Sequence, residues 1–179
     1  MREIYNNLFI DTFKNFDKSV RGSLQDLIHN DIKYVINLTE CGRLDARHRI
    51  ALMCSKIKAL DFFNDDELYR IKQIPPSSRT SNEINRRSII REQIVYANTE
   101  FLKTLSVENV NILFVCNQNN VLSQLFAFII MTLRGEDNHI PILMKDRNIV
   151  TSHKNETDIK KYLDKYMGII YNKINEVSK

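Results

Sequence analysis

Glycine is scarce in this chain: only four of its 179 residues are glycine, at positions 22, 42, 135 and 168. Between Gly42 and Gly135 there is none, which excludes a glycine-rich phosphate loop of the P-loop or dinucleotide-binding type from that stretch. Long apolar runs are also missing, since none reaches the ~18 residues that a membrane-spanning helix requires. The first seven residues are too polar for a signal peptide. We therefore expect neither a glycine-loop nucleotide-binding protein nor a membrane protein.

The charge balance is mild, and the composition is that of an ordinary globular protein. The chain carries 26 basic and 22 acidic residues, so its net charge of +4 falls far short of the basic footprint of a dedicated nucleic-acid-binding protein. The hydrophobic fraction is 43% and the charged fraction 27%, which argues against disordered and collagen-like classes. The length fits the usual size of one domain, and we predict a single domain over residues 1–179.

Cysteine and histidine are also few. Three cysteines make an odd number in a chain without a secretory signal, which predicts reduced thiols in an intracellular compartment, the cytoplasm or the nucleus. The four histidines do not fall at metal-ligand spacing with a cysteine or a carboxylate, so we predict no metal site and no cofactor. His48 and His153, with Cys54 or Cys41, are better interpreted as surface histidines and core cysteines than as a redox or metal cluster.

Hydrophobic patterns predict an alternation of strands and helices. Strands are predicted over residues 8–10, 34–38, 67–74 and 112–115. Helices are predicted over residues 23–29, 80–105, 121–134 and 156–176. Residues 43–64 are ambiguous, although an apolar set recurs there at helical spacing, namely Ile50, Met53, Cys54 and Ile57. The alternation favours an α/β fold with a central, mostly parallel sheet flanked by helices.

Several residues have the character of helix caps. Ser23 is predicted to cap the helix over 23–29, and Thr80 with Glu83 is typical of a capping box. Gly135 is expected to close the helix over 121–134, which is apolar nearly all round and should lie at the centre of the fold. The helix over 156–176 is interpreted as docked core, with a homodimer contact as the alternative.

The unit over residues 112–134 carries the most information about function. A buried strand leads into a polar loop that begins with Cys116 and continues directly into a helix. The backbone N–H groups of such a loop and the positive end of the helix dipole bind anions and acidify a thiol. A buried cysteine that simply ends a strand is the competing interpretation, and spacing alone favours it.

Residues 34–39 read Tyr-Val-Ile-Asn-Leu-Thr, and they resemble a strand of the dual-specificity branch of the protein tyrosine phosphatases. Residues 8–10 lie where that family has its opening strand, and residues 115–123 lie where it has its signature loop, H-C-x-x-G-x-x-R-S/T. Residues 147–150, followed by the last helix, resemble the C-terminal end of the family. Small viral members, of the poxvirus and baculovirus type, are closest in size. The resemblance implies one phosphatase-like domain that acts inside an infected host cell.

The signature loop departs from the family pattern at the positions that carry the chemistry. The resemblance makes Cys116 the nucleophile and Ser123 a retained hydroxyl. The residues in place of the family's loop arginine, loop glycine, preceding histidine and general-acid aspartate are Leu122, Asn119, Val115 and Ser78. Losing the arginine costs on the order of 10³–10⁵ in rate, and losing the acid on the order of 10²–10⁴. We therefore predict a pseudophosphatase, with a weak Cys116-dependent protein phosphatase or RNA 5′-phosphatase as the alternative.

Polar and basic residues around the loop are candidates for binding an anion or a partner. They are Asn117, Gln118 and Asn120 in the loop, and Arg79, Arg86 and Arg87 on or before the helix over 80–105. Arg87 and Arg91 share a helix face, but a solvated face with Glu83 paired to Arg87 and Glu92 beside Arg91 is the competing interpretation. We expect a protein or phosphoprotein partner, because the mild charge gives RNA only weak support.

Overall fold

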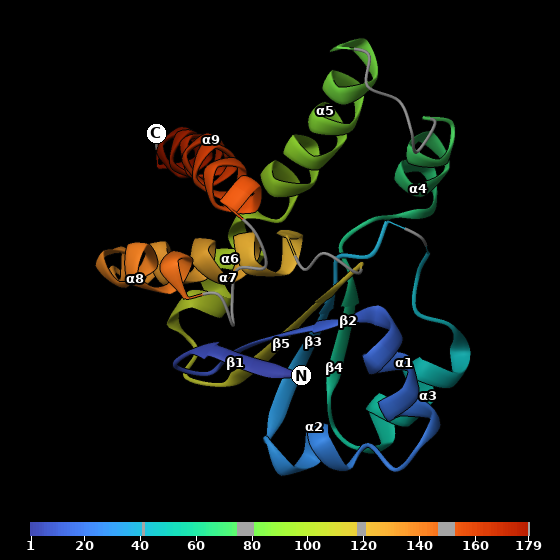
Figure 1. Cartoon of the computed structure of the whole chain (residues 1–179). Coiled ribbons are helices and arrows are strands. Elements are labelled where there is room, and N and C mark those ends of the chain that lie inside the picture. The colour runs from blue at the N-terminus through green and yellow to red at the C-terminus, as the bar shows by residue number, and fades with distance from the viewer. Residues whose placement is uncertain (41, 75–80, 118–120, 147–152, 179) are drawn as a thin grey trace.

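The computed structural model of the chain describes residues 1–40, 42–74, 81–117, 121–146 and 153–178 (Figure 1). These residues form an α/β fold in which helices cover both faces of one five-stranded sheet. The strands are β1 (Arg2–Tyr5), β2 (Leu8–Thr12), β3 (Ile32–Asn37), β4 (Lys58–Asp61) and β5 (Asn111–Cys116). The predicted α/β class, with a mostly parallel sheet flanked by helices, is confirmed.

The helices follow and connect these strands. They are α1 (Phe13–Arg21), α2 (Gln25–His29), α3 (Ala46–Cys54), α4 (Asp65–Lys72), α5 (Ser81–Ala97), α6 (Thr99–Val107), α7 (Val121–Leu133), α8 (Ile140–Lys145) and α9 (His153–Val177). A short 3₁₀ turn over Asp137–His139 precedes α8. None of the helices in the described part of the chain combines the length and the apolar character needed to cross a membrane.

The strand order across the sheet is β1-β2-β5-β3-β4. Strands β2, β5, β3 and β4 run parallel, and β1 pairs with β2 in the antiparallel direction. Strand β5 is therefore the middle strand although it is the last in sequence. Parallel strands end at the same edge of a sheet, so the carboxyl ends of β2, β3, β4 and β5 all meet at one edge.

Strand β5 is buried on both faces and divides the interior into two hydrophobic cores. Ile112 and Phe114 pack toward α6, α7 and α9, while Leu113 and Val115 pack toward α1 and α3. All four side chains are almost completely buried. This explains why the strand is apolar at every position instead of alternating, as expected for a parallel strand covered on both sides.

Helix α7 lies in the larger core, as its all-round apolar sequence predicts. Every residue from Ser123 to Met131 is buried, and α9 packs across it. Gly135 follows the helix with φ = +77°, a left-handed conformation that glycine adopts without steric cost. The prediction that residues 156–176 form a docked core helix is also confirmed, since Ile159, Tyr166 and Ile170 of α9 are buried.

The predicted strand over 67–74 is wrong, because residues 65–72 form helix α4. Asn64 caps this helix: its Oδ1 accepts from the Glu67 N–H at 2.8 Å, and the Glu67 carboxylate accepts from the Asn64 N–H at 3.2 Å. Leu68 and Ile71, three residues apart, face the core, whereas Tyr69 is exposed. A helical capping box therefore prevails over the apparent alternation.

Residues 43–64 contain helix α3 followed by strand β4, but the expected apolar face of the helix is wrong. Ile50 and Met53 are 57% and 70% exposed, and Cys54 is exposed as well. Helix α3 buries His48 and Leu52 instead. These two residues are four apart and so share one face.

Two helix boundaries and one strand also differ from the prediction. Helix α2 begins after Leu24, which has φ = +57° and makes no side-chain cap, so Ser23 is not its N-cap. The long helix predicted over 80–105 is divided at Asn98 into two helices, α5 and α6. The residues on the two sides of this break differ in burial: Ala97, the last residue of α5, is exposed, and Thr99, the first residue of α6, is buried. Thr80 lies outside the described residues, and the short, half-polar β1 was not predicted.

Candidate functional site

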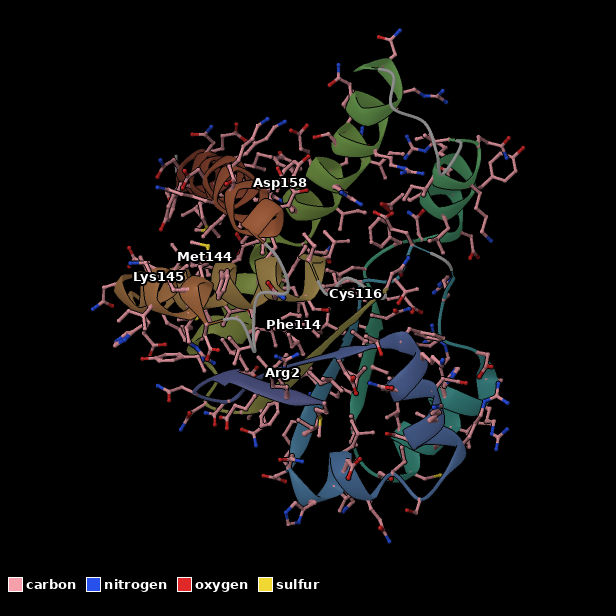
Figure 2. The ribbon with its side chains drawn as sticks, in the orientation of Figure 1. Arg2, Phe114, Cys116, Met144, Lys145 and Asp158 are labelled. Atoms are coloured by element: carbon pink, nitrogen blue, oxygen red, sulfur yellow. The ribbon has the colours of Figure 1, made fainter. Side chains whose placement is uncertain are left out.

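The candidate site lies at the carboxyl edge of the sheet, around Cys116. This residue ends β5, the middle strand, and pairs in register with Thr12 of β2. Asn37, at the end of β3, lies beside Val115 on one side and Asp61 of β4 on the other. Figure 2 shows Cys116 at the end of β5, two residues beyond Phe114. The parallel sheet thus brings the carboxyl ends of β2, β3, β4 and β5 to one edge.

Cys116 is buried, with 3% of its surface exposed. Its thiol donates to the backbone oxygen of Asn117 at 3.4 Å. Burial raises the pKa of Cys116 above its ordinary value, and the negative charge of Glu40 acts in the same direction. Hydrogen bonds from the side chain and backbone of Ser123 and from the backbone of Leu122 act against this rise but do not overcome it. The thiol is therefore protonated near neutral pH, and a protonated thiol is a poor nucleophile.

Ser123 completes the immediate surroundings of the thiol. Its side chain is fully buried, and within the described ranges its Oγ makes no hydrogen bond of ordinary geometry. The hydroxyl nevertheless lowers the pKa of Cys116, because it can donate to the sulfur once the sulfur is ionised. Thr39, two residues beyond β3, holds a second buried hydroxyl without a partner in the described part of the chain.

The positions that depart from the phosphatase pattern fall in different surroundings. Leu122, which the resemblance aligns with the family's arginine, is half-buried and packs against the larger core. Val115 is completely buried in the smaller core, on the other face of β5, and does not border the thiol. Asn119, Gln118, Asn120, Ser78 and Arg79 lie outside the described residues. Asn117 is described and exposed.

The basic residues of α5 do not form the solvated face that was the competing interpretation. Arg86 is exposed, but Arg87 is half-buried and donates to the backbone oxygen of Ile74 at 3.3 Å. Arg91 pairs with Glu40 at 2.6 Å. Glu92, the neighbour of Arg91 in sequence, pairs with Lys165 of α9 at 2.5 Å.

The ion pair between Arg91 and Glu40 was not predicted from the sequence. Burial works against the charge of Arg91, but the Glu40 carboxylate more than compensates, and the pKa of Arg91 is raised. The guanidinium is therefore held charged close to the segment that follows β3. Glu40 directly follows the strand pattern over residues 34–39. This position next to a predicted strand end is the feature of the sequence that could have indicated a role for Glu40.

A second polar cluster ties the ends of β3 and β4 together. The Asp61 carboxylate, 3% exposed, accepts from Asn37 Nδ2 at 2.8 Å and from the Leu44 N–H at 3.0 Å. Arg43 and Arg49 also pair with it. Every bond in this cluster goes to another part of the chain, so it fixes the loop after β3 and does not present a free group to a ligand.

The prediction that His48 is a surface residue is wrong. His48 is buried, not on the surface, and packs between Phe13 and Phe16 with ring centroids 5.7 Å away in each case. Its Nδ1 lies 3.2 Å from the Asp45 backbone nitrogen and 2.8 Å from Asp45 Oδ1, and its Nε2 lies 2.7 Å from Asp17 Oδ1, so each ring nitrogen faces a carboxylate. His153 has no described side chain. Among the described residues no group of three His, Cys, Asp or Glu side chains is placed to hold a metal ion.

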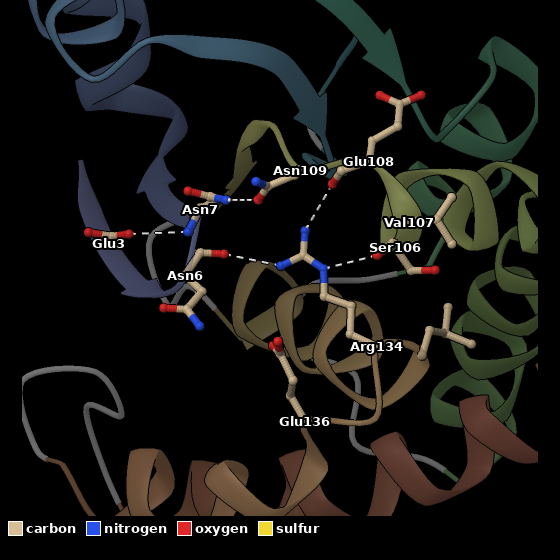
Figure 3. Close-up of a pocket in the computed structure, with 10 residues that line it drawn as sticks. Glu3, Asn6, Asn7, Ser106, Val107, Glu108, Asn109, Arg134 and Glu136 are labelled. Carbon is tan, nitrogen blue, oxygen red and sulfur yellow. Dashed lines mark hydrogen bonds between the residues drawn. The ribbon is translucent and has the colours of Figure 1, made fainter.

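A polar pocket of about 590 Å³ lies at the opposite edge of the sheet (Figure 3). Arg134 crosses it and donates to the backbone oxygens of Ser106 and Asn6, both at 3.1 Å, and of Glu108 at 3.4 Å. The guanidinium thus bonds to the end of α6 and to the turn between β1 and β2. This pocket is far from Cys116 along β5, and its arginine is engaged in holding chain segments together.

Taken together, the fold and its carboxyl edge define an α/β protein with a mostly parallel sheet, a buried cysteine that ends the middle strand, and an apolar helix that starts just beyond it. Comparison of the chain with protein-family models, curated proteins and solved structures finds no match in any of the three.

Proposed function

We propose that this chain is a phosphatase-like protein in which catalysis is lost or severely impaired, and that it acts by binding a protein or phosphoprotein partner. The observation that carries the proposal is the apolar Leu122, packed against the core at the position where a phosphatase needs a cation, beside a thiol with a raised pKa. The phosphate dianion of an aryl phosphate substrate would meet an uncharged thiol and an apolar side chain.

The topology supports the resemblance on which this proposal rests. The segments likened to the opening strand, the strand over 34–39 and the signature-loop strand are β2, β3 and β5. These three strands are neighbours in the sheet, with β5 between the other two. Cys116, at the end of β5, therefore lies between the ends of the other two strands, as a phosphate site built from these segments requires.

The proposal is tested by assaying the purified full chain with an aryl phosphate such as para-nitrophenyl phosphate. We expect no turnover above that of Cys116→Ser, with Cys54→Ser as the matched control because Cys54 is an exposed thiol. Turnover in the wild type that disappears in Cys116→Ser and persists in Cys54→Ser would contradict the proposal. Partial activity in the double variant Leu122→Arg, Asn119→Gly would support a phosphatase-like scaffold that is otherwise competent.

A weak phosphatase that uses Cys116 is the second candidate, because one observation favours it. The backbone N–H groups at Leu122 and Ser123 and the Ser123 hydroxyl all stabilise the thiolate, and the charged Arg91 is held near the same edge through Glu40. For this candidate, Arg91→Met would abolish a low activity toward an aryl phosphate or a triphosphate-ended RNA oligonucleotide. Arg86→Met, an exposed position on the same helix, would leave that activity unchanged.

A further inference from the structure

Strand β4 forms one edge of the sheet, and no other described strand pairs with its outer side. The Phe62 N–H donates to Asn37 O at 3.0 Å, toward β3. Because N–H groups alternate in direction along a strand, the N–H groups of Leu60 and Lys58 also face β3, and that of Ala59 faces outward. The backbone of Ala59 is thus presented to a further strand. Unpaired edges of this kind are templates for pairing with another chain.

A pocket of about 830 Å³ runs along this edge. It is lined from both faces of the sheet: Leu60 and Phe101 pack with the larger core, whereas Ile57 and Ala59 pack with the smaller one. Met53 of α3, an exposed side chain, also borders it. This pocket lies beside an edge strand and is open to both faces of the sheet. An added strand could occupy it, with its side chains placed above and below the sheet.

The charged residues that border this pocket, within the described part of the chain, are all basic: Arg49, Lys56 and Lys58. Arg49 pairs with Asp61, and Lys58 lies over the ring of Tyr34 at 5.4 Å. Lys56 and Lys58 are exposed. The edge therefore combines an apolar floor with positive charge, which is complementary to a segment that carries apolar and acidic residues in alternation.

We propose that the β4 edge, defined by residues 56–60, is a docking surface for an extended acidic segment of a partner protein, which adds a strand beside β4. Main-chain bonds to Ala59 supply affinity, and alternate side chains enter the apolar hollow while carboxylates meet Lys56 and Lys58. The inference rests on the proposed function in that it locates the protein partner. It does not involve Cys116.

A second copy of this chain fits the edge less well. Antiparallel pairing of two β4 strands about Ala59 would set Lys58 opposite Leu60 of the other copy, and the second copy would bring the same basic pocket lining of Arg49, Lys56 and Lys58. Lys58 would then gain no carboxylate partner, whereas an acidic segment supplies one. The positive charge along the β4 edge therefore favours an acidic segment over a second copy of this chain.

The experiment uses the full chain and a synthetic eight-residue peptide in which valine alternates with glutamate. Binding is followed by fluorescence anisotropy, and hydrogen exchange is followed at the Ala59 amide. We expect the peptide to bind, the affinity to fall as salt is raised, and the Ala59 N–H to become protected. A peptide with lysine in place of glutamate is expected not to bind.

Two variants separate the edge from general charge. Ala59→Pro removes the outward N–H but none of the bonds to β3, and proline is tolerated at such edge positions, so we expect binding to be lost with the fold intact. Lys56→Glu with Lys58→Glu should weaken binding at least about tenfold. The control, Lys160→Glu with Lys161→Glu on α9, makes the same charge change at exposed positions far from β4 and should have little effect.

The outcomes distinguish this inference from the proposed function. Peptide binding that Ala59→Pro leaves intact, or no binding by the acidic peptide, would overturn the β4 assignment and leave the Cys116 assays standing. A concentration-dependent dimer that Ala59→Pro dissolves would overturn it in favour of a second copy. Cys116→Ser should bind the peptide as the wild type does, so activity in the phosphatase assay would not affect this result.

Discussion

Arg91 of α5 donates from its Nε to Glu40 Oε1 at 2.6 Å and so joins a helix to the segment that follows β3, across 51 positions of the sequence. Both side chains are largely buried. Glu40 also acts on Cys116, because its negative charge disfavours the thiolate. One carboxylate therefore anchors the arginine and contributes to keeping the thiol protonated.

Replacing Glu40 with glutamine is expected to lower the pKa of Cys116, because it removes the negative charge and leaves Arg91 without its counter-ion. The measurement is the rate of Cys116 alkylation by iodoacetamide as a function of pH, resolved by mass spectrometry from the other thiols. The midpoint should lie at lower pH in Glu40→Gln than in the wild type. Glu108→Gln makes the same charge change at the opposite edge of the sheet and should leave the midpoint in place. An unchanged midpoint in Glu40→Gln would show that Glu40 does not act on the thiol.

Arg134 is expected to stabilise the fold through its three carbonyl contacts. Arg134→Met should lower the free energy of unfolding by about 2–3 kcal/mol, since hydrogen bonds from charged groups are worth about 1.5–3 kcal/mol each and some of the lost bonds are replaced by water. Urea denaturation followed by circular dichroism measures the difference. Arg86→Met, at an exposed position, should change stability by no more than about 0.5 kcal/mol. Equal effects of the two variants would count against this role for Arg134.

Asp17 should make the stability of the fold depend on acidic pH. Burial acts to raise the pKa of Asp17, but bonds from His48 and Arg21 prevail and hold it below its ordinary value of 3.8. Because the folded-state pKa lies below the unfolded one, ionised Asp17 stabilises the fold above pH 3.8, and this contribution is lost as the pH falls through the folded-state value.

The corresponding measurement is the free energy of unfolding between pH 7 and pH 2 for the wild type and Asp17→Asn. The two curves should converge as the pH falls, because the asparagine variant lacks the contribution that acid removes. His48→Gln, which removes the partner, should show the same flattening. Parallel curves across the whole range would contradict the assignment.

Two of the four glycines provide a matched pair of substitutions. Gly135 has φ = +77°, so alanine there would be strained, and Gly135→Ala should destabilise the fold by about 1 kcal/mol. Gly168 lies within α9, with no atom within 4 Å of an added Cβ, so Gly168→Ala should stabilise by about 0.5–1 kcal/mol. Thermal unfolding followed at the same protein concentration compares them. A shift of both variants in the same direction would contradict the assigned conformations.

The parts of the fold that could be predicted from sequence are those where the local pattern and the tertiary environment agree. Strand β5 and helix α7 are apolar almost throughout and are buried on all sides, so their composition alone identifies them. The same holds for the left-handed residue Gly135. These elements also position Cys116, and its place at the end of a buried strand followed by a helix was predictable for that reason.

The errors arose where distant contacts decide between two local patterns. Residues 67–74 alternate like a strand, but Asn64 begins a helix there and the core accepts Leu68 and Ile71 from one of its faces. His48 is predicted at the surface because its sequence separation from the cysteines gives no support for a cluster, yet two phenylalanines and Asp17 surround it. The bond between Arg91 and Glu40 joins segments whose proximity only the strand order creates. No local spacing in the sequence encodes that order.

The position of β5 also has a consequence for synthesis. Its neighbours β2 and β3 are made before it, yet they do not pair with each other, and the strand between them spans residues 111–116. Until that strand leaves the ribosome, the apolar residues of β2 and β3 along the future junction have no partner. The sheet therefore keeps an open gap between β2 and β3 until residues 111–116 have been made. The segment that closes the gap is the same one that delivers Cys116.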